Sequence, residues 1–196
     1  MTATDFALSR RALATLAALG VLLAGLIAWQ LDRPGSVKPA AAAATQIYVK
    51  VTGAKQGVLK GDATTVARKD WIVVLQYDYE LTSPRDPATG LATGKRQHKP
   101  VRITHMLDAA SPQLLQAEST NEVLKTVVIE FVRPSIKGES SVYYRVTLTN
   151  ASISDVTQTA NDTAQTEQVS FTFQKIEQES IEGKTSWTDD WSTAIS

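Results

Sequence analysis

The stretch Gly94-Lys95-Arg96-Gln97-His98-Lys99-Pro100 closes a long polar loop and leads directly into a strand-like run, Val101–Met106. The loop, Ser83–Lys99, follows Trp71–Leu81, in which apolar and polar side chains alternate. A period of two is typical of a half-buried strand, and it predicts one inward face formed by Val73, Leu75, Tyr77, Tyr79 and Leu81. Connections of this length without structure of their own are uncommon and often functional. The loop is therefore the first candidate for a functional element.

Alternating segments on both sides of this loop predict further strands. They are Gln46–Thr52, Lys125–Val132, Ser141–Thr149 and Gln168–Ile176. One short helix is predicted over Pro112–Ser119, because Ser111 is a good N-cap residue and proline is tolerated in the first helical turn. We expect Leu114, Leu115 and Ala117 to form its buried side. Short strands that dominate a chain and are joined by turns favour an antiparallel sandwich or barrel.

Composition excludes several classes of function. The chain has 196 residues, no cysteine and a formal net charge of zero. Without cysteine there are no disulfides and no thiolate metal sites. Beyond residue 44 the chain carries 16 basic and 18 acidic side chains. This balance gives no electrostatic reason to expect nucleic acid as a partner.

The N-terminal segment predicts a membrane helix. Ala12–Leu31 is a run of twenty residues without a charge, and a helix of that length spans about 30 Å, the thickness of a bilayer's hydrocarbon core. Arg10 and Arg11 precede the run and Arg33 follows it. The positive-inside rule places the N-terminus in the cytoplasm and the remainder in the periplasm, with Trp29 at the outer interface.

Three interpretations of this leader stay open at the level of sequence. It is an uncleaved signal anchor, a cleaved signal peptide with small-residue sites at Ala40–Ala44, or a buried soluble helix. Ser9–Leu13 also fits the start of a twin-arginine signal. The first interpretation predicts a single-pass inner-membrane protein, and the second a protein secreted after cleavage. The expected segments are a cytoplasmic N-terminus (1–11), a transmembrane span or signal peptide (12–31), a linker (32–45), a β-barrel domain (46–177) and a polar C-terminal tail (178–196).

No motif in the chain carries catalytic chemistry. The two histidines, His98 and His105, have no carboxylate at metal-ligand spacing. Sequences typical of a serine-hydrolase elbow, a zinc protease or a dinucleotide-binding loop do not occur. The sequence therefore predicts no enzyme and no catalytic, cofactor or metal site. The tail carries Trp187 and Trp191, and it either packs onto the domain or stays mobile.

Five stretches occur in a fixed order along the chain: Gly94–Pro100, Thr126–Pro134 (TVVIEFVRP), Tyr143–Val156 (YYRVTLTNASISDV), Glu167–Glu177 (EQVSFTFQKIE) and Asp189–Trp191. Together they resemble the hemolysin-coregulated protein (Hcp) family, the tube protein of bacterial type VI secretion. The resemblance implies a compact antiparallel β-barrel of two sheets with one helix beside it. It also implies six-membered rings that stack into a tube and can hold small effectors in the lumen.

The resemblance makes the long loop a candidate contact with a neighbouring ring, and the residues expected there are Arg85, Asp86, Lys95, Arg96 and His98. The alternative is a solvated loop without a partner. The leader departs from the family pattern, so two functions remain. One is a ring- and tube-forming subunit of the secretion apparatus that carries a membrane-targeting leader, in contact with itself and with other proteins of the apparatus. The other is a membrane-anchored monomeric binding module that faces the periplasm.

Overall fold

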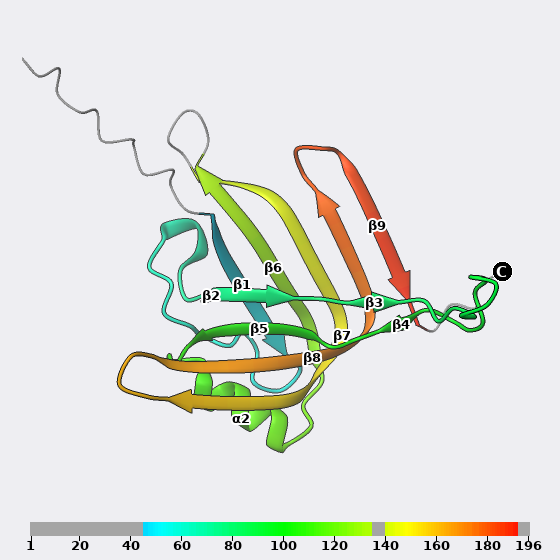
Figure 1. Ribbon diagram of the computed structural model, residues 1–196. Coiled ribbons are helices and arrows are strands. Elements are labelled where there is room, and N and C mark those ends of the chain that lie inside the picture. Colours follow the sequence, from blue (N-terminus) through cyan, green and yellow to red (C-terminus); the bar gives the residue numbers. More distant parts are fainter. Residues whose placement is uncertain (1–44, 135–139, 192–196) are drawn as a thin grey trace, which may run out of the picture. The chain divides into compact units, whose positions relative to one another are not determined.

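The computed structural model describes residues 45–134 and 140–191, and nearly all of its regular structure is β-sheet (Figure 1). In chain order the strands are β1 (Gln46–Gly53), β2 (Ile72–Asp78), β3 (Leu81–Thr82), β4 (Gln97–His98), β5 (Val101–Met106), β6 (Leu124–Pro134), β7 (Ser140–Ala160), β8 (Gln165–Ser180) and β9 (Thr185–Asp190). The described helices are the 3-10 helix η1 (Val66–Arg68) and the α-helix α2 (Ser111–Ser119).

Six of the strands close into an antiparallel barrel. The hydrogen-bonded order is β5-β2-β1-β6-β7-β8, and β5 also pairs with β8, which joins the two ends. The pairing of β5 with β8 closes the barrel within residues 46–180, and the buried residues of its main core also fall within this range. The predicted fold, a mainly β barrel with one short helix, is confirmed for the described residues.

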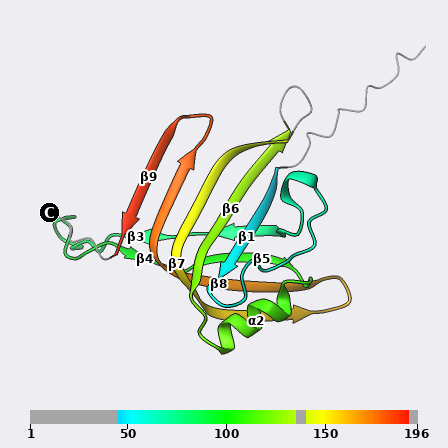
Figure 2. The same ribbon diagram turned by 180° about the vertical axis from the view of Figure 1, so that it is seen from behind.

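The single closed sheet forms two layers whose strands cross, because β7 and β8 are long and bend (Figures 1 and 2). The first half of β8 pairs with β5, from Thr166 to Phe171, and the second half pairs with β9, from Lys175 to Ser180. A register shift in β7 between Ile153 and Asp155 marks the bend, as β-bulges commonly do. The C-terminal residues, which the sequence left either packed or mobile, thus add β9 to this second half.

The core contains the apolar faces that alternation predicted. Val127 and Ile129 of β6, Val146 and Leu148 of β7, and Val169 and Phe171 of β8 are all fully buried. Phe131, Tyr144 and Phe173 continue these faces and are partly buried against the same core. Period-two alternation therefore assigned the inward side correctly on these three strands.

On β2 the predicted face is wrong in its first half. Ile72 and Val74 are buried, whereas Val73 and Leu75 are exposed. The register against β5 shifts between Val74 and Gln76, and this bulge inserts one residue, which reverses the alternation. Beyond it Tyr77 and Tyr79 point inward as predicted and pack against the core.

Helix α2 packs against β7 and begins one residue earlier than predicted, with Ala110 at the N-cap position. Leu114 and Ala117 are buried, as expected. Leu115 is 41% exposed, contrary to the prediction, because successive helical residues are separated by about 100° and only one side meets the sheet.

Removing the hydroxyl of Tyr77 should not destabilise the protein, although the side chain packs against the core. Its hydroxyl is buried and has no hydrogen-bond partner among the described residues, and burial raises the pKa of that hydroxyl well above its usual value. An unsatisfied buried hydroxyl costs about 1–3 kcal/mol. We therefore expect Tyr77→Phe to leave the free energy of unfolding unchanged or to raise it by about 1 kcal/mol, as measured by urea unfolding.

A matched control for Tyr77→Phe is Tyr144→Phe. The Tyr144 hydroxyl donates a hydrogen bond of 2.6 Å to Gln178 Oε1, so its removal should lower stability by about 0.5–1.5 kcal/mol. Equal losses in the two variants would contradict the assignment of Tyr77 as unsatisfied.

The predicted membrane helix, 12–31, lies outside the described residues, as do its flanking residues Arg10, Arg11, Trp29 and Arg33. Among the residues that are described, no helix has the length and apolar character needed to cross a membrane.

Candidate functional site

The long loop between β3 and β4 projects from the barrel as a hairpin, which we call the arm (residues 81–98; Figures 1 and 2). Two strand pairs, Leu81 with His98 and Thr82 with Gln97, form its base. Further out an isolated bridge joins Arg85 to Ala92. The arm is therefore a hairpin that is paired at its base and bridged near its tip, and its two ends connect to β2 and β5.

The tip of the arm is ordered by its own hydrogen bonds. The Asp86 carboxylate accepts from the backbone N–H groups of Ala88 and Thr89 and from the Thr89 hydroxyl, which lowers the pKa of Asp86. Gly90 has φ of +72°, a conformation that favours glycine. Leu91 follows and is 69% exposed. The tip thus presents an apolar side chain to solvent on a defined turn.

At the base of the arm, Asp189 of β9 binds two arm residues. Its carboxylate accepts a two-pronged hydrogen bond from Nε and Nη2 of Arg96. His98 Nε2 donates to Asp189 Oδ2 at 3.0 Å, and the Tyr79 hydroxyl donates to His98 Nδ1 at 2.7 Å. A single tautomer of His98, protonated on Nε2, satisfies both of its hydrogen bonds.

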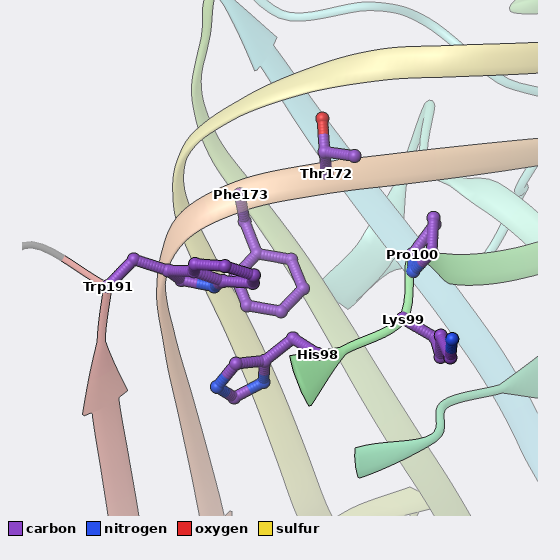
Figure 3. Close-up of a pocket in the computed structure, with 6 residues that line it drawn as sticks. All are labelled: His98, Lys99, Pro100, Thr172, Phe173 and Trp191. Carbon is purple, nitrogen blue, oxygen red and sulfur yellow. The ribbon is translucent and has the colours of Figure 1, made fainter. Parts of the chain in front are cut away.

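Aromatic rings enclose His98, whose side chain is only 3% exposed. The centroids of Phe173, Trp187 and Trp191 lie 5.5, 6.2 and 5.3 Å from the centroid of its imidazole. A cavity of about 240 Å³ opens beside it and is lined by His98, Lys99, Pro100, Thr172, Phe173 and Trp191 (Figure 3). In the close-up the rings of Phe173 and Trp191 lie side by side, next to the imidazole of His98.

The electrostatics of the base follow from these contacts. The hydrogen bonds from Arg96, and secondarily that from His98, lower the pKa of Asp189 below its usual value. Burial, together with the nearby negative charge of Asp189, raises the pKa of Tyr79 to about 12. Around neutral pH the base of the arm therefore contains the carboxylate of Asp189, the guanidinium of Arg96 and the protonated hydroxyl of Tyr79.

Low pH should weaken the contacts at the base of the arm, and a comparison with Asp189→Asn separates the contribution of Asp189 from that of other groups. Because its pKa is lower in the folded protein, Asp189 stabilises the fold above the unfolded-state value of about 3.9, and this stabilisation is lost as the pH falls through the folded value. We expect the wild type to have a higher Tm than Asp189→Asn near neutral pH. The difference should shrink toward zero in strong acid.

Thermal unfolding of both proteins, followed by circular dichroism across the acid range, checks this expectation. Other acid-sensitive groups with lowered pKa, such as Asp86 and Glu122, are present in both proteins and cancel in the difference. A Tm difference that does not vary with pH would contradict it.

The predicted ring-contact residues divide into two groups. Arg85, Asp86 and Lys95 lie on the projecting part of the arm and are not fully buried. Arg96 and His98 are instead engaged within the chain, on Asp189. The sequence brought these five residues together in one loop, but it did not indicate which of them face inward.

Sequence reasoning did not assign Asp189 a role in the site. Two adjacent acidic residues in a polar tail favour a solvated pair, so local sequence gives Asp189-Asp190 no role in the site, although Asp189–Trp191 is one of the stretches that carry the family resemblance. The available signal was periodicity: Trp187, Asp189 and Trp191 alternate, so their side chains share one face of an extended strand. All three contact His98.

The second histidine belongs to a separate cluster. His105 is fully buried, its Nε2 lies 3.2 Å from Glu167 Oε1, and its Nδ1 donates to the Met106 carbonyl at 2.7 Å. Glu167 also accepts from Gln158 at 2.5 Å. Within the described residues no group of three or more histidine, aspartate or glutamate side chains is arranged to hold a metal.

Comparison with known proteins agrees with this architecture. The chain matches the family described as "Type VI secretion system effector, Hcp" over residues 48–179. It is 34% identical over 169 residues to the "Major exported protein" of Pseudomonas aeruginosa, an alignment that covers 78% of this chain and 98% of that protein.

Solved structures share the barrel. Hcp1 from E. coli EAEC 042 has a TM-score of 0.71 and 27% identity, covering 76% of this chain and 99% of its own. The secreted protein Hcp3 of Pseudomonas aeruginosa has a TM-score of 0.64 and 31% identity, and the match covers 76% of this chain and 100% of Hcp3. The barrel fold and the family match together define a small β-barrel protein of bacterial type VI secretion. The chain belongs to the Hcp family.

Proposed function

We propose that this protein is a ring-forming subunit of a type VI secretion apparatus and that its arm contacts a neighbouring copy. The observation that carries the proposal is the family match, which spans the barrel from β1 to β8. The relatives are matched over nearly their whole length by about three quarters of this chain.

The arm supports a heterologous contact. A ring needs two different surfaces that meet head to tail, and closure stops further growth. Leu91 at the tip offers an apolar side chain, and Arg85, Asp86 and Lys95 offer charges beside it. A hairpin that leaves its own barrel with such a tip is suited to a surface on another copy.

Light scattering of residues 45–196 over a concentration series tests the proposal. A mass of six subunits is the expected result. A monomer at every concentration would overturn the ring and favour the alternative, a membrane-anchored binding module with an Hcp barrel.

The leader supports a further part of the proposal. The uncharged run 12–31, with arginines before it, suits an inner-membrane anchor that leaves the barrel in the periplasm. Fractionation of cells that express the full chain should recover it with the inner membrane, and protease added to spheroplasts should digest the barrel. Recovery of a shortened chain outside the membrane would instead show a cleaved signal.

A further inference from the structure

We infer that Asp189 is a positioning residue, and that β9 acts as a latch which fixes the direction of the arm. The inference rests on the proposed function only for its consequence, because a fixed arm is what a repeated contact between copies requires. The latch itself is a property of the single chain.

The latch joins two sequence patterns that lie some ninety residues apart. Arg96 and His98 are two residues apart on the arm, so both side chains can point to the same side. Trp187, Asp189 and Trp191 alternate along the end of β9 in the same manner. The structure brings the two sides together, with Asp189 accepting from both arm residues while the two indoles lie against His98.

Each side of the latch is anchored independently. β9 is held by six residue pairs with β8, which place Asp189 opposite Ile176 of the core. His98 is anchored by Tyr79, which packs against the core beyond β2. The Asp189 side chain is 10% exposed, and partly buried, charge-assisted hydrogen bonds are stronger than exposed ion pairs.

Besides the hydrogen bonds to Asp189, the base of the arm is held by backbone pairing, and a cavity lies beside it. This cavity is lined by His98 at the end of the arm with the following Lys99 and Pro100, by Thr172 and Phe173 of β8, and by Trp191 just after β9 (Figure 3). The hydrogen bonds of the tip run within the arm: the Ala88 N–H donates to the Asp86 carboxylate, and Arg85 donates to the Gly90 carbonyl. The tip therefore keeps its shape whether or not the base is held, so Asp189 governs the direction of the arm more than its internal fold.

Hydrogen exchange on dilute protein (residues 45–196), below the concentration at which copies associate, measures the latch directly. In Asp189→Asn and Asp189→Ala we expect amides of the base, at residues 97–99, to exchange about tenfold faster or more than in the wild type. Amides of the core strand β6, such as those of Val127 and Ile129, should exchange as before. Trypsin should also cleave more quickly after Lys95, which adjoins the base, but not after Arg85, which the tip's own hydrogen bonds hold.

Glu182→Gln is the matched control. Glu182, like Asp189, is an acidic residue in or near β9 that forms an ion pair, in this case with Arg133. About half of each of these two side chains is exposed, so the pair should contribute little. The variant should leave exchange in the arm unchanged. Equal exchange at residues 97–99 in wild type and both Asp189 variants would overturn the latch, and so would faster exchange throughout the barrel, which would show a general structural role.

Failure of the latch and failure of the ring are distinguishable. If the wild type never associates, the proposed function fails while the exchange experiment still reports on the latch. If the wild type forms rings and the Asp189 variants form them equally well with a loosened base, the latch exists but does not serve assembly, which overturns its inferred consequence.

Discussion

Replacing Phe171 with alanine should lower the free energy of unfolding by about 3–5 kcal/mol, the range seen when a large aromatic side chain is removed from a protein core. Phe171 is fully buried and is among the largest such side chains. It lies on β8 opposite Val101 of β5 and Ile153 of β7. The loss therefore falls at the pairing that closes the barrel, where the surrounding strands cannot collapse into the cavity.

For a domain of about 150 residues the same change should lower Tm by about 6–20 °C. Thermal unfolding of residues 45–196 measures it. Thr172→Ala, at the next residue on the outer side of β8, is the control. It removes an exposed hydroxyl that is hydrogen-bonded to Ser152, so it should cost only about 0.5–1.5 kcal/mol. A similar small effect for Phe171→Ala would mean that β5 and β8 do not close the barrel.

Replacing Leu91 with aspartate should shift the assembled protein toward monomer without unfolding it. Leu91 is 69% exposed in the single chain, so aspartate costs little there. Burying a leucine at a contact contributes about 1.5–3 kcal/mol, and an aspartate in its place would be a buried unpaired charge. Each contact should weaken by a factor of about ten or more, and a closed ring of six contacts multiplies the effect.

Light scattering of wild type and variant at equal concentrations checks this result. Leu115→Asp is the matched control, because Leu115 is an exposed leucine on α2, away from the arm. It should leave the mass of the assembly unchanged. Rings that form equally well from Leu91→Asp protein would exclude the arm tip from the contact.

The sequence by itself determined most of the barrel. Alternation placed Val127, Val146 and Phe171 inside, and turn residues separated the strands, because a strand with one buried face must repeat every two residues. The five ordered stretches indicated the Hcp family. The length of the polar connection singled out the arm as a candidate functional element, and its contact with another copy stays a proposal.

Tertiary structure decided what depends on pairing between distant segments. The bulge in β2 that exposes Val73 and Leu75 is set by the pairing register with β5. The local sequence of β2 does not indicate where this pairing requires an extra residue. The partner of Arg96 and His98 lies on β9, more than ninety residues later. Periodicity assigns a side chain to a face, but only the closed barrel brings the face of β9 against the base of the arm.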